Sequence, residues 1–561
     1  MRATDMPPRL GVDAESSPRA VRCAAIALAA AALAYDPAAH AADPKRVAIL
    51  LVAAAALAGW RRGGVHTLPP GALAWFAFVA LSALMMWVRQ TPGDADLATY
   101  VGAATLLAAA SLRPRDEIAA TARLTALLIG AGAAAWALAQ ALARARGLGI
   151  HGGQGNPNWL GLLLAVTLPL SLSAAARARA RGRAVFVAAV AGVVAQLAAL
   201  VLAQSRTAVV ALVAAGVASV IAHPAASRAG RSLAIGTAAA MVGIAALLVH
   251  AGALASLAGR LWIWRLSARA AADALPWGDG LGRFPAAFLG EQGHALAALP
   301  ASEAARQFVN ATTAHNDWLQ TAVETGLPGV LALGAALVLG FRACRRSGAL
   351  AEAATIVSFA IAAVADSPMR QPAILVLLVL ALASAPRRAS APAAAAPARG
   401  THALRACGLL AAAAVLPLAT SAWLGARLAT HARDAGPDQQ FALLSRAAEI
   451  DPRSGEIAFA LAMAELERAA PQAAALDLRK SGALLPQVAT DVALGNALLA
   501  AGDADNAAIA YERALALNPG SFRAHVNLVV ALRRLGRDDE ADWHLRIARR
   551  LLPGHPALRE L

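Results

Sequence analysis

The stretch HNDWLQTAVETGLPGVLALGAALVLGF, residues 315–341, joins a polar beginning to an apolar run long enough to cross a membrane. If this stretch is helical, Asp317, Gln320 and Glu324 share one face, because they are three and then four residues apart. Ionisable groups at membrane depth are costly and usually functional. Capping and dipole stabilisation at a helix start explain the acids equally well, but they do not explain His315 beside them.

The composition of the 561-residue chain is typical of an integral membrane protein, with 59% hydrophobic and 15% charged residues. The formal net charge of +16 comes largely from arginines in short clusters between apolar runs. Because no basic stripe with interleaved aromatic residues is present, we expect membrane lipids around the chain and no nucleic-acid partner. Cys23, Cys344 and Cys407 have neither metal-site spacing nor even pairing, so the sequence predicts no zinc site and no disulfide framework.

Apolar runs predict about thirteen transmembrane helices. Nine fall within residues 20–256, three within 318–386, and the last at 403–424. The first run resembles a cleavable signal peptide, but the apolar runs that follow directly favour an uncleaved helix. The predicted spans are 20–35, 47–60, 70–88, 97–112, 119–143, 158–175, 184–204, 207–222, 233–256, 318–341, 350–365, 371–386 and 403–424.

Arginine clusters fall in alternate loops between these runs, and the positive-inside rule places those loops in the cytoplasm with residues 1–19. The opposite loops, which include Asp94, Asp96 and a long loop at 257–317, then face outward, as does everything after residue 424. The arginine-bearing loops contain Arg61, Arg113, Arg177, Arg228, Arg342 and Arg387.

Three polar sites then lie on the outer face. GNPNW, Gly155–Trp159, is a tight turn or simply a helix start with an early proline. QSRTA places Arg206 almost inside the bilayer, where it needs a partner, an anionic ligand or a path to the interface. The long loop opens with GRLWIWR, in which Arg260 and Arg265 flank two tryptophans, continues through PWGDGLGRF and ends at His315. These tryptophans also suit a role as interfacial anchors, and the arginines a role as partners of nearby acids.

In their order, spacing and placement, these pieces resemble the O-antigen ligase superfamily over residues 155–372. The marks are GNPNWLGLLLAVTLPL, SRTA, GRLWIW, PWGDGLGRF, AHNDWLQTAVETGLPGV and DSPMRQP. The resemblance implies a GT-C-like architecture and a glycosyltransferase that needs no cofactor and no metal. It implies transfer of a glycan from a polyprenyl-diphosphate carrier to an acceptor hydroxyl at the periplasmic face of the bacterial inner membrane. The superfamily includes ligases, polymerases and protein O-oligosaccharyltransferases, so the acceptor is a glycan, lipid A core or a protein.

The resemblance also assigns roles to residues. His315 matches the catalytic loop histidine and is a candidate general base, while Glu324 is an alternative base or an orienting group. Arg206 and Arg260 match positions that handle the diphosphate, because a guanidinium holds phosphate oxygens in pairs. Arg265 is a candidate contact to glycan or carrier. Attack opposite an alpha-linked diphosphate inverts the anomeric centre. Three asparagines are expected to be scaffold or glycan-binding residues: Asn156, Asn158 and Asn316.

The carboxyl-terminal part repeats. Pro452, Pro486, Pro519 and Pro553 are spaced 34, 33 and 34 residues apart by subtraction, a period typical of tetratricopeptide repeats. A Pro/Ala linker at 387–402 and the last span precede these repeats, which we place at 438–559 in the periplasm. Because such solenoids offer a concave face, we expect a protein partner there and no catalysis.

The sequence thus predicts an all-α chain, in which a polytopic membrane part of about 12–13 spans precedes a solenoid. A polysaccharide transporter or assembly scaffold is the alternative from another class of protein. Transporters often show paired half-sequence repeats with broken helices near the middle of the membrane. The polar sites here lie on one face instead, which favours the enzyme.

Overall fold

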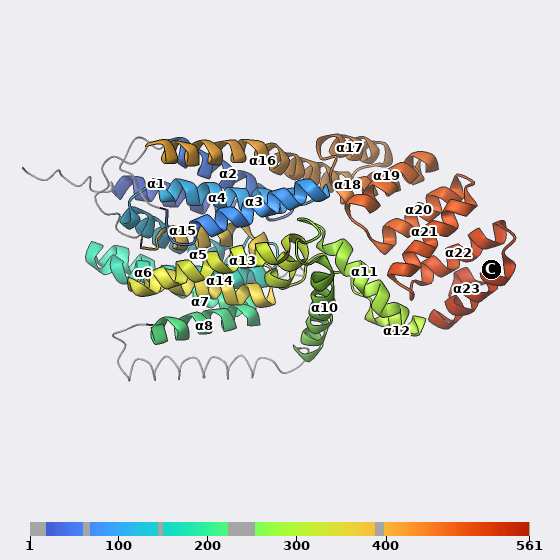
Figure 1. Cartoon of the computed structure of the whole chain (residues 1–561), viewed down its shortest axis with the longest axis horizontal. Helices are drawn as coiled ribbons and strands as arrows, with labels where there is room; N and C mark the ends of the chain where they lie inside the picture. The colour runs from blue at the N-terminus through green and yellow to red at the C-terminus, as the bar shows by residue number, and fades with distance from the viewer. Residues whose placement is uncertain (1–17, 60–67, 144–149, 223–252, 387–397, 560) are drawn as a thin grey trace, which may run out of the picture.

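The computed structural model describes residues 18–59, 68–143, 150–222, 253–386, 398–559 and 561, and every regular element in these ranges is helical. A bundle of roughly parallel helices forms one end of the molecule, and a curved solenoid of helix pairs forms the other (Figure 1). This arrangement confirms the predicted all-α fold and its division into a membrane part and a repeat part.

Each predicted span that lies in the described ranges coincides with one helix. The span predicted at 233–256 falls almost entirely outside the described residues. The bundle helices are α1 (Pro18–Leu33), α2 (Asp43–Ala58), α3 (Ala72–Arg89), α4 (Asp94–Ser111), α5 (Arg115–Leu142), α6 (Pro157–Ala178), α7 (Arg183–Ala203), α8 (Arg206–Ala222), α13 (Asp317–Arg346), α14 (Leu350–Ala365), α15 (Pro372–Ala383) and α16 (Ala398–Ala432).

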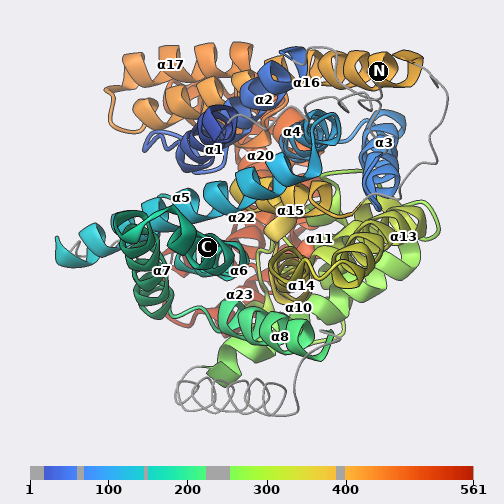
Figure 2. The ribbon, with the colours of Figure 1, turned by 90° about the vertical axis from the view of Figure 1, so that its left-hand side faces the viewer.

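Six of the described helices are long and apolar enough to cross a membrane by length and composition, namely α3, α5, α6, α7, α13 and α16. The other predicted spans in the described ranges are helices that fall short of this length or hydropathy, so their crossing of a membrane stays a prediction. In α15, all 12 residues are buried, and Figure 2 shows this helix enclosed by its neighbours in the bundle. A short helix of this kind belongs to the protein core and needs no full membrane length.

Most of the predicted long outer loop is helical. It contains α10 (Ala253–Ala274), α11 (Phe284–Ala297) and α12 (Ala301–Gln307), which lie between the bundle and the solenoid (Figure 1). Leu266, Phe284, Phe288 and Val323 form a small apolar core of their own at this place. This core fixes the outer segment against the start of α13.

The repeats are antiparallel helix pairs, as their period predicts. Gly502 and Gly536 take positive φ angles of 87° and 70° in the turns after two of the helices, a conformation that favours glycine. Each pair is packed by small residues against large ones, as where Gly495 meets the ring of the buried Tyr511. The helices are α17 (Pro437–Ile450), α18 (Gly455–Glu467), α19 (Pro471–Leu484), α20 (Val488–Ala500), α21 (Ala504–Leu517), α22 (Phe522–Arg534) and α23 (Asp538–Leu551).

Candidate functional site

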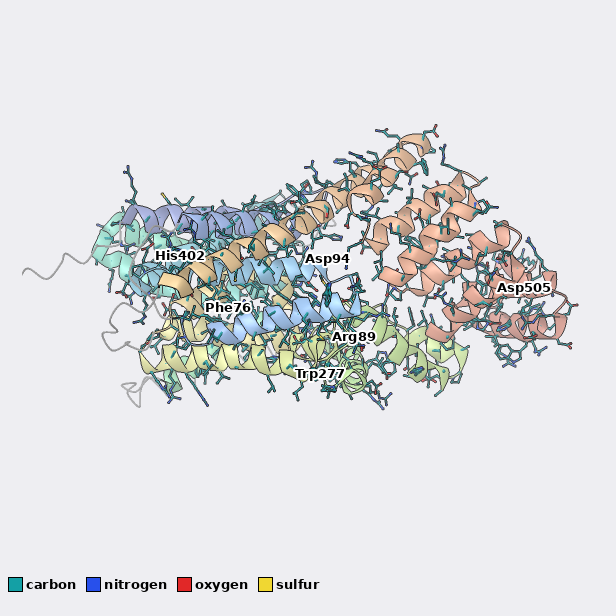
Figure 3. All side chains as sticks on the ribbon, turned by 45° about the horizontal axis from the view of Figure 1, so that its top comes forward. Phe76, Arg89, Asp94, Trp277, His402 and Asp505 are labelled. Atoms are coloured by element: carbon teal, nitrogen blue, oxygen red, sulfur yellow. The ribbon has the colours of Figure 1, made fainter. Side chains whose placement is uncertain are left out.

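The loops predicted to face outward gather at the end of the bundle nearest the repeats. The Thr91 hydroxyl donates to the Leu281 carbonyl at 2.6 Å, and Asp94 pairs with Arg453 of the first repeats at 2.6 Å. In Figure 3, Arg89, Asp94 and Trp277 lie toward the repeats, whereas His402 lies at the far end of the bundle. The two sets of loops are therefore separated as the arginine alternation predicts.

Contacts between arginine-bearing loops define the opposite end of the bundle. Arg115, at the start of α5, donates from Nε to the carbonyl of Ser384 after α15, at 3.0 Å. Arg123 pairs with Glu352, near the start of α14, at 3.1 Å. The placement of this end in the cytoplasm stays a prediction.

His315 lies directly before α13, and its backbone is held in an unusual conformation. Its φ of 47° is left-handed, which a residue other than glycine keeps only when its surroundings hold it there. The Trp264 indole donates to the His315 carbonyl at 3.2 Å. The Asn316 side chain caps α13 by accepting from the Leu319 amide at 3.0 Å. The segment thus caps the start of α13 and also holds the backbone of His315 in place.

The His315 imidazole lies at a boundary between solvent and protein. Its side chain is 43% exposed, yet Nδ1 is buried and has no hydrogen-bond partner among the described residues. Oδ1 of the buried Asp366 lies 3.9 Å from this nitrogen. This exceeds a hydrogen-bond length, but such contacts often tighten only when substrate binds. If the Asp366 carboxylate accepts a hydrogen bond from Nδ1, the other ring nitrogen, Nε2, can accept or donate a proton.

Arg260 joins the SRTA motif to the turn that carries Asp366. From α10, its Nη1 donates to the Thr207 hydroxyl at 3.3 Å and to the Ala365 carbonyl at 3.0 Å. Arg206, next to Thr207, is the first residue of α8 and has an exposed side chain. A helix amino terminus with two guanidinium groups beside it favours an anion. Arg260 and His315 therefore approach the same turn.

Arg370 of the DSPMRQP motif is the centre of a buried ionic cluster. Its Nη2 lies 3.0 Å from Asp96 and 3.0 Å from Glu324, and its Nη1 lies 3.7 Å from Asp317. Burial by itself would lower the pKa of Arg370, but the neighbouring Asp96 and Glu324 raise it above its usual value. The guanidinium stays charged and ties α4, α13 and the turn before α15 together.

The ionic cluster also settles how Glu324 is placed. Gln320 donates to Glu324 at 3.0 Å, so these two residues share one helix face as predicted. Only 2% of Glu324 is exposed, and both of its carboxylate oxygens accept from Arg370. This geometry favours an orienting role for Glu324 over that of a base. Within the described ranges, no three His, Cys, Asp or Glu side chains are arranged to hold a metal ion.

A break in α13 explains the glycines of PWGDGLGRF. Gly326 has a φ of 64° inside α13, and Pro328 follows it, so carbonyls of the preceding turn lose helical partners. The amides of Asp279 and Gly280 donate to the carbonyls of Val323 and Glu324, at 2.8 and 3.0 Å. A β-carbon on Gly278 would approach Glu324 to 2.7 Å. The motif therefore braces the helix that carries the acids.

The remaining predicted residues are distributed around this site. Asn156 caps α6 by accepting from the Asn158 amide at 2.7 Å, in agreement with a scaffold role. Both asparagines are partly buried. Arg265 is exposed on α10, one residue beyond Trp264.

A cavity of about 1270 Å³ opens between the outer loops and the first repeats. His315 and Arg370 line it together with Gly155 and Trp159 of GNPNW. Arg206 and Arg260 are not among its lining residues in the described structure. Arg260 contacts the Ala365 carbonyl and also Thr207, the residue after Arg206. His315 thus lines the cavity and also lies near the turn that Arg260 contacts.

Two acids and one arginine of this site are not among the predicted site residues. The sequence places Asp96 only in an outer loop, and Asp366 and Arg370 only within the DSPMRQP motif. The available signal was the polar DSPMR, flanked by two apolar runs, on the same face as His315. Their partners are distant in sequence, so only the fold identifies them.

Fold and site together define a helical, membrane-type protein whose outer loops form one site beneath a repeat solenoid. Residues 191–334 match the O-antigen ligase family, and residues 498–561 match a tetratricopeptide repeat family. These matches confirm the resemblance predicted from the motifs, and the first contains Arg206, Arg260 and His315. They identify the chain as ligase- or glycosyltransferase-like in its middle part.

No curated protein matches the chain. One similar solved structure is the crystal structure of MamA protein, with 24% identity, 26% of this chain and 81% of that chain covered, and a TM-score of 0.22. Another is the APC/C hetero-tetramer Cut9-Hcn1, with 14% identity, 86% of this chain and 91% of that chain covered, and a TM-score of 0.23.

Proposed function

We propose that this protein transfers a glycan from a polyprenyl-diphosphate carrier to an acceptor hydroxyl at the periplasmic face of the bacterial inner membrane. The observation that carries the proposal is the position of His315, between Asp366 and the cavity, with Arg260 bonded to the adjacent Ala365 carbonyl. A proton acceptor and anion-binding groups meet at one turn. This is the combination that transfer from a diphosphate requires.

In this mechanism, the acceptor hydroxyl approaches from the cavity and gives its proton to His315. Its oxygen attacks the anomeric carbon of the donor sugar from the face opposite the diphosphate. The bond from that carbon to the diphosphate oxygen breaks, and its electron pair leaves with the diphosphate, so the anomeric centre is inverted. Arg260 and Arg206 stabilise the charge on the leaving group. Asp366 orients the imidazole and stabilises its protonated form.

The alternative acceptors share this chemistry. A ligase acting on lipid A core, a polymerase extending a glycan and a protein O-oligosaccharyltransferase each present a hydroxyl to the same base. The alternative from another class is a polysaccharide transporter or scaffold, with the repeats recruiting partners. The buried histidine nitrogen beside a carboxylate favours the enzyme, because a scaffold has no need of a positioned base.

The test is transfer by purified protein from a lipid-linked oligosaccharide to each acceptor class. Wild-type protein should form product, while His315→Ala should form none yet still bind the carrier-linked donor. His294→Ala, which changes an exposed histidine that does not line the cavity, is the matched control and should transfer as wild type. Normal transfer by His315→Ala would remove this residue from the mechanism. A wild-type protein that moves glycan across vesicles without forming product would favour the transporter.

A further inference from the structure

The repeats are joined to the membrane part by a continuous helix. α16 spans 35 residues, from the bundle to the first repeats (Figure 1). Near its end, a β-carbon on Gly425 would lie 2.9 Å from Asp451 and 3.0 Å from Ile457. The first repeats therefore pack tightly on α16, and their position is set by the bundle.

Two further contacts hold the repeats over the outer loops. Arg453 pairs with Asp94 at 2.6 Å and donates to the Thr91 carbonyl at 2.7 Å. Farther along the solenoid, Gly293 of α11 packs on the Ala516 carbonyl, so closely that it has no room for a side chain. The solenoid is thus fixed at its beginning and at its middle, and Asp94 and Arg453 of the first support also line the cavity.

The first repeats form one wall of that cavity. Gln440 of α17 and Phe459 and Met463 of α18 line it, as do His315 and Trp159 of the membrane part. At about 1270 Å³, the cavity exceeds the usual 300–1000 Å³ of a small-molecule pocket, so it has room for several sugars. The repeats are therefore part of the space in front of the base, in addition to any partner that they bind elsewhere.

The lining chemistry suits a glycan. Its polar groups include uncharged hydroxyls and amides, which match the alternating donors and acceptors of sugar hydroxyls, and charged groups such as Asp43, Arg433 and Glu456, which also form hydrogen bonds with hydroxyls. Aromatic rings add flat apolar surfaces for the faces of sugar rings. Tyr35, one of these rings, is held in place by Trp136 at 5.0 Å and by His151 at 6.0 Å between ring centroids. Lining residues of these kinds include Thr312, Thr430, Ser421, Asn310, Gln371 and Gln440.

We propose that this cavity is the binding site for an extended acceptor glycan, and that Gln440 and Met463 of the repeats determine acceptor specificity. The inference rests on the proposed function, in which the donor diphosphate lies on the arginine side of His315 and the acceptor enters from the cavity. Sugars beyond the reacting hydroxyl then contact the repeat wall. Shortened acceptors leave that wall empty.

The direct test is binding without turnover, measured by calorimetry on the full-length protein in detergent. The probes are two lipid-free glycans from the host bacterium, its core oligosaccharide and the repeat unit of its surface polysaccharide. We expect one of them to bind, and Met463→Glu to weaken that binding at least about tenfold, a loss of roughly 1.4 kcal/mol. Leu476→Glu changes an equally apolar residue in the next helix, 66% exposed and outside the lining, and should bind as wild type.

The kinetic counterpart uses the Michaelis constants for two acceptors. Met463→Glu and Gln440→Ala should raise KM for the long acceptor and leave kcat with a single-sugar acceptor unchanged. If folded Met463→Glu protein bound each glycan as tightly as wild type does, the proposal would be overturned. Binding of an unglycosylated acceptor protein, and of neither glycan, would overturn it as well. Calorimetry needs no donor. If wild-type protein failed to transfer glycan, the proposed reaction would be contradicted, but the binding test of the cavity would still be valid.

Discussion

Arg370 donates from Nη2 to both carboxylate oxygens of Glu324, at 3.0 and 3.2 Å. Through this pair, the turn before α15 is bound to the first half of α13. His315 directly precedes α13, and Asp366 lies four residues before Arg370. The ionic cluster therefore sets the separation of His315 from Asp366, although neither of them belongs to it.

Removing the arginine should be far more damaging than breaking an exposed pair. Arg370→Met leaves Asp96, Asp317 and Glu324 buried without their cation, which should cost about 3–5 kcal/mol of folding free energy. Thermal unfolding in detergent measures this loss. Arg446→Met, which breaks a pair with 67% and 66% exposed side chains, is the control and should cost less than about 1 kcal/mol. Adding Glu324→Gln to Arg370→Met should restore part of the stability; no recovery would argue against the cluster.

Asp366 should act through His315. We expect Asp366→Asn to lower kcat by about ten- to a hundredfold with little change in KM for the donor, the range seen when a supporting group is lost. The double variant with His315→Ala should be no slower than His315→Ala alone, because the two residues act as one unit. Steady-state kinetics of the three variants decides this. Additive losses would place Asp366 in a separate role.

The arginines should act through geometry as well as charge. Arg206→Lys and Arg260→Lys keep the charge but lose the planar fork, so transfer should fall about tenfold or more while the protein still accumulates. Arg269→Lys, an exposed position on α10, is the matched control. Since arginines are proposed to hold the diphosphate, a chelator should leave the rate unchanged. Activity that is lost with chelator and restored by magnesium would contradict this assignment.

Acid should destabilise the repeats through a histidine pair. His525 Nε2 meets the Pro519 carbonyl at 3.0 Å and so carries hydrogen, which leaves Nδ1 to accept from His544 Nδ1 at 2.9 Å. Burial and the nearby His525 lower the pKa of His544 to about 4, and burial lowers the pKa of His525. Both pKa values are lower in the folded state, so protonation favours unfolding. The stability is present above about pH 6.5 and is lost as pH falls toward 4.

The measurement is the unfolding temperature of the repeat transition between pH 7.5 and about pH 4.5. We expect a drop of several degrees in wild type and a clearly smaller one in His544→Gln. His431→Gln changes an exposed histidine outside this pair and serves as the control. Identical pH dependence in His544→Gln and wild type would show that the pair does not titrate as described.

The orientation of the chain can be read with a reporter that is active only in the cytoplasm. Fused after Leu561, it should stay silent, because the arginine alternation places the repeats in the periplasm. Fused after Arg388, within the predicted cytoplasmic linker, it should be active. Strong activity from the first fusion would overturn both the topology and the external site.

The sequence alone determined the class of fold and the local elements, because apolar runs, helix starts and the repeat period are short-range signals. The residues adjacent to them in the sequence are enough to identify His315 and Asn316, and the spacing identifies the four repeat prolines. The number of spans stays a prediction, since α15 is as apolar as a lipid-facing helix but is buried inside the bundle. Hydropathy reports how strongly a segment prefers an apolar environment to water. It does not distinguish a lipid environment from a protein core.

Only the tertiary structure decided which polar residues meet. Asp96, Glu324 and Arg370 come from three separate segments, and no periodicity links them in the sequence. The same holds for Met463, which lines the same cavity as His315 because α16 carries the repeats to that place. Ionic pairing and cavity walls depend on distances between distant segments, and packing sets those distances. The sequence could therefore supply the candidate base and the candidate arginines, but the fold had to supply the partners that position them.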